Sequence, residues 1–241
     1  MAIYRIYPEK DTTIWSEPNT AGVYGNAGKD PILEIGGYPD KDLVGRSNRS
    51  IVQFKTTDIV NTIDNKVTGV ISSSLNLYLA EASEIPSDFT IYAYPVSQSW
   101  INGTGRKQDD PVNKTGCSWK YRGAEENEWG TLGGDYITSS VSGSQTFNLN
   151  SSYDIKMDVS NIVSSYYSSS IANYGMLLKI QDTYENYTSA SVNLKYFGGD
   201  SHTIFPPYLE FKWDDTSYSS SLSELSTDIA TIAIKNHREK Y

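Results

Sequence analysis

The chain has 241 residues, of which 38% are hydrophobic and 20% charged, and its formal net charge is -9. An acidic chain without a basic patch argues against nucleic acid and anionic membrane surfaces as partners. The single cysteine, Cys117, excludes an internal disulfide framework, and 19 tyrosines against 6 phenylalanines favour half-buried strand faces in one all-β domain.

The first residues carry no recognisable secretion signal. The stretch "MAIYRIYPEKD" (1–11) lacks the apolar core of a signal peptide, and no apolar run in the chain reaches the length of a membrane span. Taken as a complete N-terminus, this stretch predicts a protein that is made in the cytoplasm and is not secreted.

Alternation of apolar and polar residues predicts short strands along most of the chain. Glycine, asparagine, aspartate, serine and proline separate most of them, which is typical of turns. About ten such strands without alternating helices predict an antiparallel sandwich or barrel. In chain order the predicted strands are 3–7, 33–35, 50–55, 74–80, 89–96, 144–150, 154–159, 174–182, 191–197 and 206–213.

A long segment rich in aromatic residues and glycine, 99–136, interrupts the strands between the fifth and sixth of these. In sugar-binding modules aromatic faces serve as platforms for pyranose rings. The alternative is that the aromatic side chains anchor a long loop to the sandwich while the glycines allow tight turns, and we favour this alternative. The aromatic residues in question are Trp100, Trp119, Tyr121, Trp129 and Tyr136.

One stretch has helical periodicity. Val159, Ile162, Val163 and Tyr166 are spaced at i, i+3, i+4 and i+7, which predicts a short amphipathic helix that closes one end of the sandwich.

The composition changes near Asp214. Residues 214–226 are rich in serine and predict a linker, whereas 227–241 regain an apolar, β-branched pattern. An isolated strand cannot bury its own face, so we expect 227–241 either to dock on a partner through Ile229, Ile232 and Ile234 or to begin a further domain.

No pattern of catalytic residues is present, and we expect that the protein is not an enzyme and needs no cofactor. His202, His237 and Cys117 have no neighbours at catalytic or metal-binding spacing. A structural calcium ion is the one alternative, because acidic loops suit that ion, although their spacing fits no known calcium loop and solvated surface loops are the simpler interpretation. The acidic loops contain Asp109, Asp110, Glu125, Glu126, Glu128, Asp214 and Asp215.

Eight short motifs in order resemble the DNRLRE-type module, a jelly-roll domain related to carbohydrate-binding modules. They are "YPEKDTTIWSE" (7–17), "GNAG" with "ILEIGG" (25–37), "RSIVQFK" (49–55), "LNLYL" (75–79), "SQSW", "GTG", "GCSW" and "WGTLGGDY" within 97–136, "IKMDVSNIVSSYY" (155–167), "NYGMLLK" (173–179) and "HTIFPPYLEFKW" (202–213). The resemblance spans roughly residues 3–213 and implies a jelly-roll β-sandwich over 1–213.

Such modules occur in bacterial surface proteins and, without a signal peptide, in structural proteins of tailed-phage virions. The missing signal and the serine-rich tail favour the second setting. We therefore expect a non-enzymatic virion component of a fibre, whisker, collar, neck or other tail-associated assembly, with other virion proteins and copies of itself as partners. The alternative is a carbohydrate-binding module that recognises a surface polysaccharide.

Overall fold

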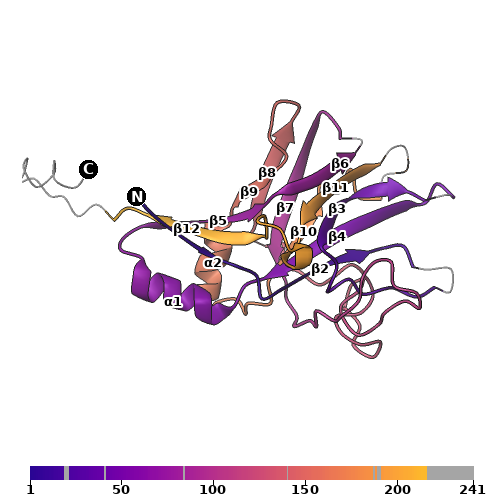
Figure 1. The fold of residues 1–241 in the computed structure, drawn as a ribbon, viewed down its shortest axis with the longest axis horizontal. Coiled ribbons are helices and arrows are strands. Elements are labelled where there is room, and N and C mark those ends of the chain that lie inside the picture. The colour runs from indigo at the N-terminus through magenta and orange to yellow at the C-terminus, as the bar shows by residue number, and fades with distance from the viewer. Residues whose placement is uncertain are drawn as a thin grey trace, which may run out of the picture.

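The computed structural model describes residues 1–18, 22–40, 42–83, 85–139, 141–186, 188 and 191–215. They form two antiparallel sheets that face each other (Figure 1). The smaller sheet has the order β1 (Ala2–Ile6), β12 (Tyr208–Trp213), β5 (Ile71–Leu77) and β9 (Ile155–Asp158).

The larger sheet is curled, and β2 (Lys10–Trp15) joins it by pairing with β4. Its other strands, in order, are β6 (Leu79–Ser83), β11 (Val192–Phe197), β3 (Ile32–Pro39), β4 (Gly45–Gln53), β10 (Met176–Ile180), β7 (Asp88–Pro95) and β8 (Gly143–Asn148). The predicted all-β, jelly-roll-like antiparallel sandwich is confirmed.

The main core lies between the two sheets. Leu75 and Phe211 from the smaller sheet and Phe89 from the larger one are at most 1% exposed within it. Their burial follows from the period of two along each strand, which turns alternate side chains inward.

The centre of the larger sheet is buried on both faces. On β4, Val52 faces the main core and Ile51 a second core on the other side; on β10, Leu178 and Leu177 divide in the same way. Burial on both faces explains why the sequence of β10 begins with consecutive apolar residues and does not alternate between apolar and polar ones.

Two helices pack at one end of the sandwich (Figure 1). The predicted helix is confirmed as α2 (Ser160–Tyr167), which buries Ile162, Val163 and Tyr166. The other helix, α1 (Thr56–Lys66), was not predicted, although it buries Ile59 against the main core. A single turn of 3-10 helix, η1 (Gly199–Ser201), precedes β12.

In the described part of the chain, no helix is both long enough and apolar enough to cross a membrane. Most of the predicted linker and the whole predicted docking strand, including Ile229, Ile232 and Ile234, lie outside the described residues.

Candidate functional site

The aromatic segment is an insertion in a hairpin. Strands β7 and β8 pair directly, with Ala93 opposite Gly143, so the chain leaves and re-enters the larger sheet at one place. Between them the insertion forms the pink loops below β2 and β4 in Figure 1. Its residues cover the outer face of the larger sheet and create the second core.

The three tryptophans of the insertion point into this second core. Trp100, Trp119 and Trp129 are only 3%, 8% and 5% exposed. They pack with Ile14, Ile51, Val96, Cys117 and Leu177. This burial is what an anchoring role of the tryptophans requires, because a buried ring offers no exposed flat platform for a sugar.

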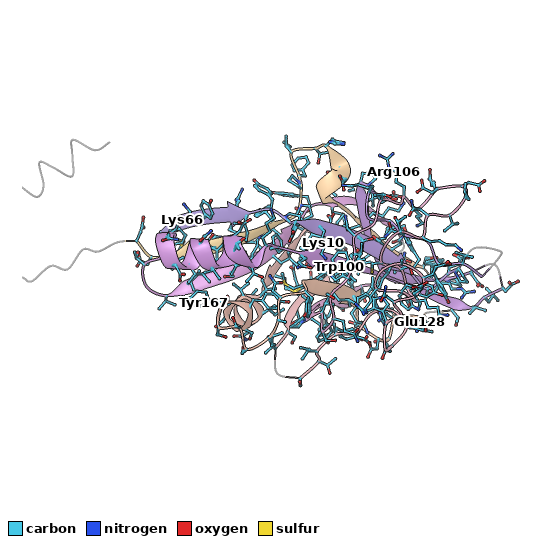
Figure 2. All side chains as sticks on the ribbon, turned by 90° about the horizontal axis from the view of Figure 1, so that it is seen from below. Lys10, Lys66, Trp100, Arg106, Glu128 and Tyr167 are labelled. Atoms are coloured by element: carbon cyan, nitrogen blue, oxygen red, sulfur yellow. The ribbon has the colours of Figure 1, made fainter. Side chains whose placement is uncertain are left out.

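Two of the indole N–H groups are satisfied inside the protein. Trp100 donates to the carbonyl oxygen of Tyr174 at 2.8 Å, and Trp129 donates to that of Ser118 at 3.0 Å. Lys10 on β2 lies beside Trp100 (Figure 2), with its ammonium 4.2 Å from the ring centroid. Burial lowers the pKa of Lys10. The indoles therefore hold the loop to the strands by hydrogen bonds and packing together.

A buried ion pair ties the insertion to the sheet. Arg49 on β4 donates from Nε to Oε1 of Glu185 at 2.8 Å and from Nη2 to Oε2 at 2.9 Å. Its remaining terminal nitrogen, Nη1, donates to the carbonyl oxygen of Gly133 at 2.8 Å, and its guanidinium carbon lies 4.9 Å from the Trp119 ring centroid. Burial opposes the charge of Arg49, but the hydrogen bonds and charge of Glu185 outweigh it and raise the pKa of Arg49.

Lys179 on β10 extends this network. Its ammonium lies 2.9 Å from Oε2 of Glu185 and 2.5 Å from Oδ1 of Asp182. The carboxylate of Glu185 thus serves two buried cations, and the loop after β10 is fixed beside the insertion. Removing Glu185 would leave the buried guanidinium of Arg49 without its ion-pair partner.

A second contact of this kind lies at the other side of the insertion. Lys107 donates to both carboxylate oxygens of Glu34 on β3 at 2.7 Å. The indole of Trp15 and the amide of Asn48 also donate to Glu34, at 3.2 and 3.1 Å. Glu34 therefore accepts from three elements, and Lys107 brings the insertion into this arrangement.

Asn26 is the point at which three of the motifs meet. Its side-chain amide donates to the carbonyl oxygens of Asn102 and Cys117 at 2.7 and 2.9 Å. Its Oδ1 accepts from the backbone N–H of Gly105 at 2.8 Å. "GNAG", "GTG" and "GCSW" thus converge on one buried side chain, which their spacing in the sequence does not reveal.

The two tyrosines named with the tryptophans are half-buried. Tyr136 stacks on Tyr94 of β7, with ring centroids 5.2 Å apart. The ammonium of Lys120 lies 5.1 Å from the ring centroid of Tyr121. The five predicted aromatic residues therefore do not form one exposed surface, since three are buried and the two tyrosines have different neighbours.

The histidine and cysteine that the structure describes are not arranged for catalysis. His202 is exposed and has left-handed backbone geometry, with φ 52°. Cys117 is fully buried in the second core, and this burial raises the pKa of its thiol. A buried neutral thiol is a poor nucleophile. His237 lies outside the described residues, and the absence of enzymatic activity stays a prediction.

Several of the acidic side chains considered for calcium form ion pairs instead. Glu125 pairs with Lys114 at 2.6 Å, Glu128 with Lys120 at 3.0 Å, and Asp215 with the N-terminal amino group at 2.9 Å. Among the described residues, three or more His, Cys, Asp or Glu side chains nowhere gather as they would around a metal ion. Nothing in this part of the chain supports the calcium alternative.

A different feature, the edge strand β1, exposes apolar side chains. The structure leaves Ile3 52% and Tyr4 38% exposed on β1 and Tyr7, directly after it, 57% exposed, and β1 pairs with β12 on one side only. An exposed apolar edge strand is able to pair with a strand from another chain. Sequence reasoning identified β1 as a strand but not as an edge, because strand order is not visible in the local pattern.

Three other sheet edges, at β6, β8 and β9, carry polar or charged side-chain contacts. At β8 and β9, the side chain of Gln145 bonds to the backbone of both Asp154, at 3.1 Å, and Lys156, at 2.7 Å. Strand β6 carries Glu81, which pairs with Lys195 at 2.8 Å. Bridged and charged edges resist pairing with other chains, whereas β1 exposes apolar side chains at its edge.

Comparison of the chain with protein-family models and with curated protein sequences finds no match.

Proposed function

We propose that this protein is a structural component of a tailed-phage virion and that it acts by assembling with copies of itself and with other virion proteins. The observation that carries the assembly part is the apolar edge strand β1, with Ile3 on the strand and Tyr7 directly after it more than half exposed. The resemblance of residues 3–213 to DNRLRE-type modules supports the virion setting.

The anchoring of the insertion to the larger sheet also supports this function. Arg49 and Lys107 bond the insertion to the larger sheet from two sides, and the three tryptophans fill the space beneath it. A virion part must hold its surfaces in fixed positions, and a loop anchored in this way adds a third layer to the sandwich. The same burial makes the three tryptophans unfavourable sugar contacts, so the carbohydrate alternative would depend on the half-buried Tyr121 and Tyr136.

Two experiments test the proposal. The first compares the full chain with a variant that lacks residues 216–241. Thermal unfolding should show that the shortened chain keeps its melting temperature, and sedimentation velocity should show that it loses self-association. Mass spectrometry of purified phage particles should detect peptides of this chain at a fixed ratio to the other tail proteins. A shortened chain that associates like the full chain, or particles without these peptides, would count against the proposal.

A further inference from the structure

A groove runs along the free edge of β1. It has a volume of about 490 Å³, which is in the size range of peptide and small-ligand sites. Consecutive residues of the chain, Tyr4, Arg5, Ile6 and Tyr7, form one wall. Since alternate residues of a strand point to opposite faces, a wall of consecutive residues means that the groove opens onto the strand's edge.

Helix α1 forms the other wall. Its residues Asp58, Asn61, Thr62 and Lys66 line the groove at helical spacing. The ammonium of Lys66 lies 4.5 Å from the ring centroid of Tyr4 and links the two walls. Figure 2 shows Lys66 at the opposite end of the molecule from Glu128 of the insertion, so the groove and the insertion are separate surfaces.

The shape of the groove selects the kind of occupant. Lys66 on α1 lies beside Tyr4 of β1, so an occupant of the groove would lie between the helix and the edge of the strand. An extended segment in this position would form main-chain hydrogen bonds to the free edge of β1. Both faces of that edge offer apolar atoms, because Ile3 and Tyr4 point to opposite faces and are 52% and 38% exposed.

We infer that the groove receives residues 227–234 of a second copy of this chain, an inference that rests on the proposed assembly function. This segment, "TDIATIAI", is the β-branched stretch that predicts a docking strand, and its length suits the five residues of β1. Added to β1, it would extend the smaller sheet by one strand.

The point at which the chain leaves the sandwich allows the tail to reach a neighbouring copy. Strand β12 runs antiparallel to β1, with Trp213 opposite Ala2. The chain therefore leaves the sandwich at the Ala2 end of β1, heading away from the groove walls at Ile6 and Tyr7. Residues 214–226 can span about 45 Å at ~3.4 Å per residue, enough to reach the groove of an adjacent molecule as well as that of the same chain. The choice of a second copy rests on the proposed self-assembly. Tail and groove on one chain would join copies head to tail, as in rings or filaments.

Cross-linking between two full-length variants tests this inference. One chain carries Tyr7→Cys and an affinity tag, the other carries Ile232→Cys, and a short flexible bismaleimide is added to the mixture. Native Cys117 is 0% exposed and will not react in the folded protein. The matched control replaces Tyr7→Cys by Leu149→Cys, a side chain that is 71% exposed in the loop after β8.

We expect a tagged heterodimer with Tyr7→Cys and at least about tenfold less of it with Leu149→Cys. Equal cross-linking of both, or no heterodimer, would overturn the inference. So would a double variant, Tyr7→Cys with Ile232→Cys, that forms its cross-link only within one chain. If removal of residues 216–241 abolishes self-association but Tyr7→Cys is not cross-linked, the assembly function stands and the assignment of the acceptor groove fails.

A second variant tests the same inference without chemical modification. Ile3→Lys places a charge on the exposed edge of β1 and should weaken self-association by about tenfold or more, at an unchanged melting temperature. Leu149→Lys is the matched control and should associate like the unmodified chain. Undiminished association of the Ile3→Lys variant would overturn the inference. If this variant does not fold, the cross-linking experiment remains the deciding test.

Discussion

Arg49 and Glu185 form a two-pronged ion pair beneath the insertion, with N–O distances of 2.8 and 2.9 Å and side chains 11% and 5% exposed. Because removal of one partner leaves the other charge buried, we expect Glu185→Ala to lower the free energy of unfolding by about 3–5 kcal/mol. Glu81→Ala is the control, since it breaks an exposed pair worth about 1 kcal/mol or less. Urea unfolding followed by tryptophan fluorescence measures both, and equal losses would contradict the structure.

The carboxyl group of Asp11 on β2 gives the fold a pH dependence. Asp11 is 5% exposed, and burial raises its pKa from 3.8 to about 6, although the Gly199 N–H donates to it at 2.7 Å. The folded state therefore binds this proton more tightly than the unfolded state does. The resulting stabilisation is complete below pH 3.8 and is lost as the pH rises through 6.

We therefore expect Asp11→Asn to be more stable than the unmodified chain at pH 7.5, by up to roughly 3 kcal/mol. The advantage should disappear by about pH 4, near the usual pKa of the carboxyl group. Urea unfolding of both proteins at several pH values measures the difference in their free energies of unfolding. The contributions of the other acidic groups are common to both proteins and cancel in this difference. Parallel curves for the two proteins between pH 4 and 7.5 would refute a raised pKa of Asp11.

Substitutions at Gly103 and Gly22 distinguish the cost of backbone strain from the cost of close packing, because both residues have φ 75°. A Cβ atom at Gly103 would lie 2.3 Å from Oδ1 of Asn26, whereas one at Gly22 would have no atom within 4 Å. We expect Gly22→Ala to cost about 1–2 kcal/mol of unfolding free energy, from strain alone. Gly103→Ala should cost a further ~1–3 kcal/mol from overpacking. Thermal unfolding compares the two, and equal losses would show that the motifs do not meet at Asn26.

Trp119 distinguishes an anchoring role from sugar contact. If its ring is part of the second core, Trp119→Ala should lower the free energy of unfolding by about 3–5 kcal/mol. Tyr121→Ala, at a half-buried position, should cost about 1 kcal/mol. A glycan array run with both variants adds the functional readout. Binding of a polysaccharide that Trp119→Ala abolishes without loss of stability would favour the carbohydrate alternative instead.

The local pattern of the sequence predicted most strands and helix α2, because each depends on the periodicity of a few neighbouring residues. It did not predict α1, where β-branched residues together with Asn61, Asp64 and Asn65 weaken the helical signal. Packing against the main core, through Ile59 and Ile63, supplies what propensity lacks.

The contacts that fix the insertion depend on residues far apart in the chain and could not be predicted locally. Arg49 and Glu185 are separated by 136 positions, and Asn26 and Gly105 by 79. The sequence did indicate that tryptophans anchor the insertion, because aromatic residues interleaved with glycines are typical of a compact loop. The exposure of β1 depends on strand order, which only the assembled sheets define.

The dependence of molar mass on protein concentration tests the central claim, self-assembly, most directly. Light scattering coupled to size exclusion should give a mass that rises with concentration to multiples of the 26.8 kDa chain. The Ile3→Lys variant should stay close to 26.8 kDa over the same range. A full-length chain that remains at 26.8 kDa at every concentration would contradict assembly through the edge of β1.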